Sequence, residues 1–147
     1  MEEFYFSVGD NQLFSKTIGE FDIYAFAGIT GDFSPNHVNE IFMKQTHYGG
    51  RIAHGVLLIG FMSTASTLLV EKKRNNEWSE SPVSKGYNKI RFLEGVCIGD
   101  TISVSYTVKS IELDKRQTLA DVKITNQNGN LVAIAEHIMK WVKIKND

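Results

Sequence analysis

The chain has 147 residues, of which 42% are hydrophobic and 22% charged, and 16 Lys and Arg against 17 Asp and Glu give a formal net charge of −1. This near balance provides no broad basic face, so nucleic acid is not an expected partner. The composition is typical of a globular protein. The length predicts a single domain over residues 1–147 with a substantial core.

The chain contains one cysteine, Cys97. It therefore cannot form an intrachain disulfide, and it suits a reducing compartment. The first ten residues, MEEFYFSVGD, lack the apolar segment of a signal peptide. The longest apolar stretch, residues 56–70, is short for a bilayer span and is interrupted by Ser and Thr. We therefore expect a cytoplasmic protein that does not bind membranes.

The first half of the chain has helical patterns. Residues 21–32 carry apolar side chains at helical spacing, and Gly31 stands where the residue after a helix is often glycine. Residues 38–46 predict a short helix with Asn39 as its cap. Residues 53–74 are apolar around most of a helical circumference, so we expect this helix to be buried on nearly all sides.

The second half changes to the alternating pattern of strands. Strands are predicted near residues 86–93 and over 101–110, 118–127 and 131–144, with a hairpin turn at 127–130. Helices followed by long antiparallel strands indicate the α+β class. An antiparallel sheet curved around the apolar helix is the simplest arrangement, and it leaves an open edge that a second subunit could extend.

Two features in the middle of the chain, within residues 60–85, have alternative interpretations. Residues 75–85 read as a flexible loop, in which Trp78 could pack on a partner subunit or close a pocket. Gly60 costs about 1 kcal/mol in a helix relative to Ala, so it serves either close approach of the sheet or space for a ligand.

The segment GITGDFSPNHVNE at residues 28–40 places an acid and an imidazole close together, at Asp32 and His37. Pro35 bends the chain between them, so both side chains can point at one place. Such a pair can perform acid–base chemistry near neutral pH. The structural alternative is that Asp32 caps backbone amides while His37 is an ordinary surface histidine.

Glycine precedes and begins the long apolar helix, in the segment GGRIAHGVLL at residues 49–58. A helix N-terminus has free N–H groups and a partial positive charge, so the amide of Gly55 could stabilise an oxyanion. The structural alternative is that these glycines only allow a tight turn and close packing. His54 is expected to fix the turn before the helix.

The segments FAGITGDFSPNHVN and GGRIAHGVL, in this order and spacing, resemble the MaoC-like family of R-specific enoyl-CoA hydratases. The match covers about residues 21–70, and IRFLEGVCIGDTI further along is also similar to the family. The resemblance implies a hot-dog fold, in which an antiparallel sheet wraps around a long central helix. That arrangement agrees with the one expected from the pattern of helices and strands.

The resemblance also implies roles for four residues. Asp32 and His37 would activate the water that adds to C3 of a trans-2-enoyl thioester and relay a proton to C2. The Gly55 amide would bind the thioester carbonyl, and Ser63 on the central helix would support the acid–base pair. The chain departs from the family pattern in the turn, at Ser34, Asn36 and Asn39. These departures leave the acid, the base and the amide in place, while substrate preference becomes open.

The expected function is therefore reversible syn hydration of an enoyl thioester, or dehydration of the corresponding R-3-hydroxyacyl thioester. The carrier is CoA or acyl carrier protein, with no separate cofactor. A homodimer or a dimer of dimers is expected. No metal is expected, because His47, His54 and Cys97 lack the spacing of metal ligands.

Two other functions compete with this expectation. A hot-dog thioesterase would commonly place an acidic residue on the central helix, but residues 55–70 contain no Asp or Glu. A non-catalytic acyl-thioester-binding module would not need Asp32, His37 and Gly55 together.

Overall fold

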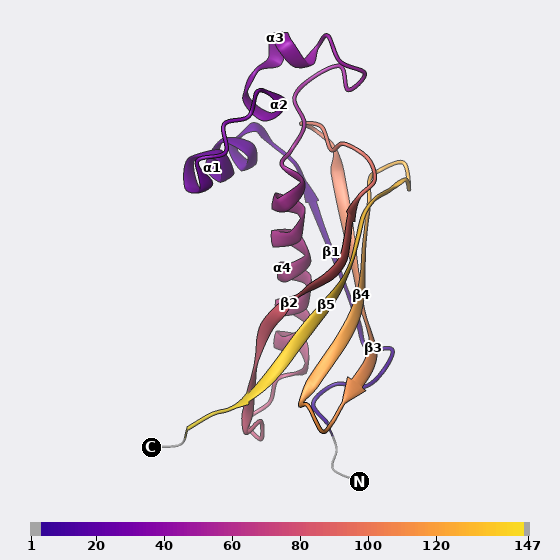
Figure 1. Cartoon of the computed structure of the whole chain (residues 1–147). Helices are drawn as coiled ribbons and strands as arrows, with labels where there is room; N and C mark the ends of the chain where they lie inside the picture. The colour runs from indigo at the N-terminus through magenta and orange to yellow at the C-terminus, as the bar shows by residue number, and fades with distance from the viewer. Residues whose placement is uncertain (1–3, 146–147) are drawn as a thin grey trace.

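The computed structural model describes residues 4–145 (Figure 1). In chain order its elements are β1 (Asn11–Thr17), α1 (Glu20–Thr30), α2 (Pro35–Val38), α3 (Glu40–Met43), α4 (Gly55–Lys73), β2 (Glu80–Phe92), β3 (Thr101–Glu112), β4 (Gln117–Thr125) and β5 (Leu131–Lys143). The predicted α+β class is confirmed.

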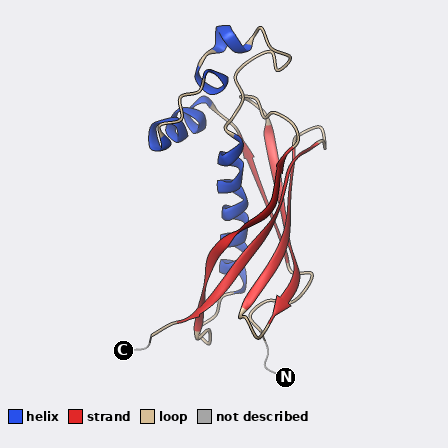
Figure 2. Ribbon diagram, in the orientation of Figure 1, coloured by secondary structure: helices blue, strands red, loops and turns tan. Residues whose placement is uncertain are grey.

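One antiparallel sheet holds all five strands in the order β1-β3-β4-β5-β2. Figure 2 shows its strands twisting together along one side of α4. Strand β3 shows that the sheet has one buried face and one exposed face. Its residues Ile102, Val104 and Tyr106 are buried, while the residues that alternate with them are more exposed. Its inner face therefore packs on the helix.

Helix α4 supplies the other half of the core. Leu58, Met62 and Leu69 are almost fully buried in the same cluster as the inner residues of the sheet. This sheet-around-helix arrangement is the hot-dog fold, as expected. Strands β1 and β2 are its two edges, so the open edge inferred from the sequence is present.

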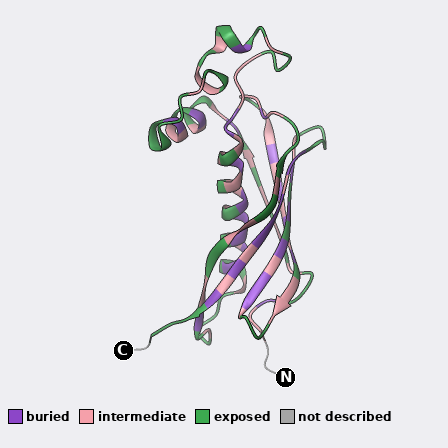
Figure 3. Cartoon of the chain, in the orientation of Figure 1, coloured by how far each residue is buried: buried purple, intermediate pink, exposed green. Residues whose placement is uncertain are grey.

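The expectation that α4 is buried on nearly all sides was wrong for the single chain. Val56, Gly60, Ser63 and Thr67 lie on one side of the helix and are exposed (Figure 3). A Cβ atom added at Gly60 would meet no atom within 4 Å, so this glycine does not serve close approach of the sheet within the chain.

The helix that contains the apolar stretch of residues 56–70 is longer than that stretch. Helix α4 has 19 residues and a mean hydropathy of 1.3, which is long and apolar enough for a span by length and composition alone. The core helix of a soluble protein passes the same test, and α4 packs one side on the sheet. Its length is therefore weak support for a membrane role.

The three short helices project beyond the N-terminal end of α4 (Figure 1). Gly31 ends α1 with a left-handed φ of 80°, which confirms its predicted place. The Asn39 side chain accepts a hydrogen bond from Phe42 N at 3.0 Å, which confirms the cap of α3. An additional helical turn, α2, was not predicted; its first residue is Pro35, which is favoured at that position.

The segment before α1 and the segment after α4 both differ from expectation. Strand β1 was not predicted, and β2 begins at Glu80, so the second half of the expected loop is strand. Trp78 is half-buried and packs within the single chain, so the two alternatives for it stay predictions. Its ring lies 5.2 Å from that of Trp141 and 4.9 Å from that of Tyr5, in an aromatic cluster of the core.

Candidate active site

Asp32 follows the glycine that ends α1, and its side chain is exposed. Its carboxylate accepts a hydrogen bond from Ser34 N at 3.3 Å, while its backbone carbonyl accepts one from His54 Nε2 at 2.9 Å. The carboxylate therefore makes the local turn contact that the structural interpretation expected. It also keeps acceptor capacity free for a ligand.

His37 lies on α2 and is half-buried. Its Nδ1 is 2.7 Å from the carbonyl oxygen of Ile52. A carbonyl can only accept, so Nδ1 carries the hydrogen. In the neutral ring Nε2 then bears the lone pair, and no other contact of His37 within residues 4–145 uses that atom. The fold thus prepares His37 to take a proton at Nε2.

His54 contacts both Asp32 and His37. Its side chain is 1% exposed, and its ring stacks on that of His37 with centroids 3.7 Å apart and planes inclined by 27°. Phe26 of α1 lies against it at 4.7 Å. From the sequence, His54 was expected only to fix the turn before the helix. Its stacking on His37 could not be predicted, because the two residues lie in different segments of the chain.

Gly55 is the first residue of α4, and its N–H has no hydrogen-bond partner among the described residues. A Cβ atom here would lie 2.8 Å from the Phe92 ring, so only glycine allows this strand to approach the helix. Gly55, His37 and Tyr48 line one pocket of about 190 Å³, with Phe92 on its β2 side. Gly55 and the imidazole of His37 therefore line the same cavity.

Arg51 fastens the projecting helices to the loop that leads into α4. Its guanidinium pairs with Glu20 of α1 and with Glu40 of α3, and it also donates to Tyr24. The hydrogen bond from Arg51 holds the pKa of the Glu40 carboxyl below its usual value. This network ties α1 and α3 to the segment that carries Ile52 and His54, and so fixes the two halves of the site relative to each other.

Ser63 does not join the other three residues within one chain. It lies two turns further along α4 and lines a different pocket, against β2 and β5. Its expected support of the acid–base pair therefore remains a prediction.

Asp32, His37 and His54 can each place one polar side-chain atom within 4.8 Å of the others. No metal was expected from the spacing of the histidines and the cysteine along the chain, and that spacing does not show that these three residues meet. Each of the two imidazoles already uses one nitrogen on a backbone carbonyl, which leaves one nitrogen on each ring. The same arrangement suits acid–base chemistry, and the prediction that no metal is bound stays a prediction.

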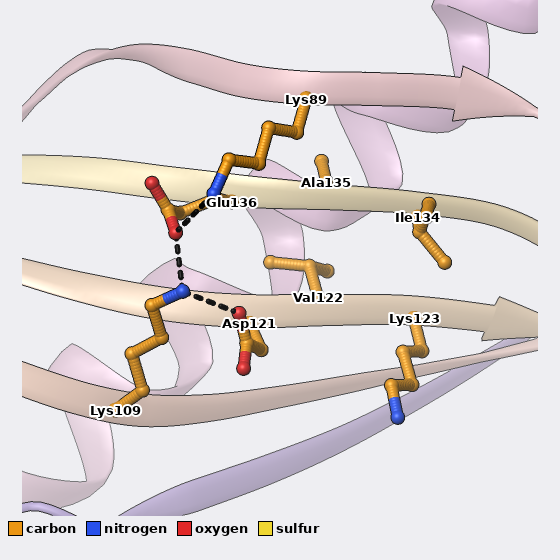
Figure 4. Close-up of a pocket in the computed structure, with 8 residues that line it drawn as sticks. All are labelled: Lys89, Lys109, Asp121, Val122, Lys123, Ile134, Ala135 and Glu136. Atoms are coloured by element: carbon orange, nitrogen blue, oxygen red, sulfur yellow. Dashed lines mark hydrogen bonds and ion pairs between the residues drawn. The ribbon is translucent and has the colours of Figure 1, made fainter.

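Another pocket, of about 260 Å³, lies on the outer face of the sheet, away from α4 (Figure 4). Lys109 there pairs with Asp121 at 3.1 Å and with Glu136, and Lys89 lies 4.0 Å from Glu136. The hydrogen bond from Lys109 lowers the pKa of Glu136. These charges satisfy one another across neighbouring strands, so the pocket is an ion-pair network rather than a candidate for the chemistry.

The local geometry and the overall fold both agree with one group of known proteins. Residues 6–129 match the family described as MaoC like domain. The chain belongs to the MaoC-like family. This MaoC-like chain is 34% identical over 108 residues to the (R)-specific enoyl-CoA hydratase of Rhodospirillum rubrum, covering 74% of this chain and 69% of that protein.

Solved structures place the MaoC-like chain in the same fold. The (R)-hydratase of Aeromonas caviae has a TM-score of 0.78 and 27% identity, covering 92% of this chain and 96% of that one. A protein from Archaeoglobus described as a monoamine oxidase regulatory protein has a TM-score of 0.80 and 27% identity, covering 96% and 93%. The hot-dog fold and the family are confirmed, and the expected hydro-lyase class agrees with the names of its relatives.

Proposed function

We propose that this protein hydrates trans-2-enoyl thioesters to R-3-hydroxyacyl thioesters and catalyses the reverse dehydration. The observation that carries the proposal is the convergence of Asp32, His37 and the Gly55 amide. The acid and the imidazole approach within 4.8 Å, and the imidazole lines the same cavity as Gly55. The relatives named as hydratases support the same chemistry.

In the proposed mechanism, each of these groups has a separate role. Water bound between Asp32 and His37 loses a proton to the free Nε2 of His37 as its oxygen bonds to C3. The electrons of the C2–C3 double bond move toward the thioester carbonyl, whose oxygen gains negative charge. The Gly55 N–H, at the positive end of α4, stabilises that oxygen. A proton returned to C2 from the same side completes the addition.

We propose that Asp32 orients the water through its exposed carboxylate. A carboxylate accepts hydrogen bonds from both the water and a backbone amide, so its contact with Ser34 N fixes the carboxylate rather than blocking it. CoA or acyl carrier protein is the proposed carrier, and a metal or separate cofactor has no step in this scheme. The proposed location is the cytoplasm.

We propose that the protein acts as a homodimer, or as a dimer of dimers. Apolar side chains of the projecting helices are strongly exposed in the single chain, including Phe21 at 81%, Ile29 at 84% and Ile41 at 78%. Val56 at the start of α4 is also exposed, at 50%. A second copy could cover these side chains and pair with the open edge of β2. Light scattering after size-exclusion chromatography measures the expected even number of subunits.

Crotonyl-CoA tests the reaction class. Loss of the conjugated enoyl absorbance without release of free thiol supports hydration. Release of thiol would identify a thioesterase instead, and saturable binding without either change would identify a binding module. The same two readouts applied to Asp32→Asn and His37→Ala decide whether the assigned site performs the reaction.

A further inference from the structure

A second, polar pocket lies along the seam between α4 and the strands β2 and β5. It has a volume of about 240 Å³, and hydroxyl groups line much of it: Ser63, Ser66 and Thr67 of α4 and Ser84 of β2, beside His137 of β5. Ser63 and Thr67 are exposed, so the pocket opens on the uncovered side of the helix. The Ser66 hydroxyl already donates to the Ser63 carbonyl at 2.7 Å, whereas Ser63, Thr67 and Ser84 are exposed, so their hydroxyl groups are open to a ligand or to water.

The hydrogen bonds behind this pocket have a fixed direction. His137 is fully buried, and burial lowers its pKa to about 4, so its ring is neutral and carries a single N–H. Tyr106 Oη lies 2.7 Å from Nδ1 of His137 and has no other hydrogen-bond partner among residues 4–145. Its hydroxyl must therefore donate to Nδ1, because a buried donor left without an acceptor is costly.

The direction of the next bond follows. With Nδ1 acting as acceptor, the N–H of His137 lies on Nε2 and donates to Ser84 Oγ at 2.8 Å. The Ser84 hydroxyl can then donate its own hydrogen, which no described residue accepts; because Ser84 is exposed, this hydrogen points to water or to a ligand in the pocket. The chain from Tyr106 through His137 thus ends in a donor on the wall of the pocket.

Tyr87 adds a second polar group beside the first. Its ring stacks on His137 with centroids 4.4 Å apart, and its buried Oη has no well-formed hydrogen bond among the described residues. Burial raises the pKa of Tyr87, and the neighbouring Ser63 side chain partly offsets this rise. Tyr87 does not itself line the pocket, but it adds a buried and incompletely satisfied hydroxyl against His137, which does.

Building on the proposed function, we propose that this pocket binds an oxygen acceptor, a hydroxyl or a keto group, on the distal part of the acyl chain. The preferred substrate is then an oxygenated enoyl thioester rather than a plain hydrocarbon one. The volume is below the range of about 300–1,000 Å³ typical of pockets for whole ligands, which suits the end of a chain.

The spacing along α4 sets the length of that chain. Ser63 follows Gly55 by eight residues, which is about 12 Å along a helix. An extended chain advances about 1.2 Å per bond, so about ten bonds cover this distance, which is the reach from C1 to the terminal oxygen of a ten-carbon thioester hydroxylated at its end; an eight-carbon one falls about two bonds short.

Two matched pairs of thioesters test the proposal. The reactive pair is trans-2-octenoyl-CoA and 8-hydroxy-trans-2-octenoyl-CoA, compared by kcat/KM. The saturated pair is octanoyl-CoA and 8-hydroxyoctanoyl-CoA, compared by calorimetric Kd, which does not depend on turnover. A ten-carbon version of each pair covers the longer reach. We expect the terminal hydroxyl to improve both quantities by roughly three- to tenfold in the ten-carbon pairs, the effect of one hydrogen bond.

Three variants locate the preference. Ser84→Ala should abolish it, and Ser84→Thr, which keeps a hydroxyl, should retain it. Ser103→Ala is the matched control, because the Ser103 hydroxyl bonds Ser15 at 2.9 Å on the opposite face of the sheet, and it should retain the preference fully. Tyr87→Phe should reduce the preference while keeping the aromatic ring against His137. This variant provides an independent test if Ser84→Ala fails to fold.

The outcomes separate this inference from the proposed function. Equal binding of the two saturated ten-carbon thioesters, or a preference that survives in Ser84→Ala, overturns the inference and leaves solvent as the occupant of the pocket. Failure to hydrate crotonyl-CoA overturns the proposed function, while the calorimetric comparison still decides whether the pocket selects an oxygen acceptor.

Discussion

The ring of His54 lies flat against that of His37, with centroids 3.7 Å apart, while its Nε2 donates to the backbone carbonyl of Asp32. One buried side chain therefore touches both members of the proposed acid–base pair. Its position just before Gly55 also connects the pair to the N-terminus of α4. The site is thus held by contacts between segments rather than by the turn alone.

Replacement of His54 separates its two contacts. His54→Phe keeps an aromatic ring against His37 but removes the donor to Asp32, whereas His54→Gln keeps a donor but removes the ring. We expect each to lower kcat by about ten- to a hundredfold with little change in KM, because the proposed base and acid lose alignment. Steady-state kinetics with crotonyl-CoA measure this split. A rise in KM at constant kcat in both variants would instead assign His54 to substrate binding.

The acid and the base themselves should be indispensable. Asp32→Asn and His37→Ala should each lower turnover by roughly two to four orders of magnitude, since general acid–base catalysis contributes about that much. Circular dichroism should show an unchanged fold, because the Asp32 side chain is exposed and His37 is only half-buried. Turnover near that of the wild type in both variants would remove the assigned site.

Gly55→Ala should damage the site by a packing mechanism. The new methyl group would lie 2.8 Å from the Phe92 ring, so either the strand or the start of the helix must shift. We expect a loss of about 1–3 kcal/mol in the free energy of unfolding, together with reduced hydration.

The matched control for Gly55→Ala is Gly28→Ala in α1, where an added Cβ meets nothing within 4 Å. Because alanine favours helix, this change should stabilise the protein by up to about 1 kcal/mol. Thermal unfolding of both variants provides the comparison. An equal response at the two positions would show that Phe92 does not constrain Gly55.

Buried His137 predicts how stability depends on pH. Its folded pKa is lowered by burial to about 4, while an unfolded chain has the ordinary value of 6.5. Between these values the unfolded chain binds more protons, so the contribution to stability is complete above pH 6.5 and is lost as the pH falls toward 4. The loss amounts to about 3 kcal/mol.

Denaturant unfolding at a series of pH values measures this loss, and an NMR titration should find His137 neutral from pH 5 to 8. His137→Gln should flatten the dependence over this interval. An unchanged slope in that variant would assign the dependence to other groups.

The sequence predicted those parts of the molecule that depend on local chemistry. Gly31 and Asn39 are recognisable because a left-handed residue and a side-chain cap follow from neighbouring residues alone. Asp32 and His37 were found because a proline turn brings nearby residues together. Strand β1 was missed because it is an edge strand whose residues alternate only between exposed and half-buried, which leaves a weak apolar pattern.

Contacts across long sequence separations could not be read from the pattern. The bond from His54 to Asp32 spans 22 residues and appears only when α1 and α4 are placed together. Trp78 lies in a loop, as predicted, but its packing against three aromatic rings from distant segments could not be predicted. The exposed side of α4 was hidden for the same reason, since composition gives no information about which face the sheet covers.

The stereochemistry of addition tests the central claim most directly. If Asp32 and His37 deliver both the water and the proton from one side, hydration of crotonyl-CoA in deuterated water must be syn. NMR of the 3-hydroxybutyryl product should then show one deuterium at C2, on the same face as the new hydroxyl, in the R product. Anti addition, or deuterium scrambled over both faces of C2, would contradict the account.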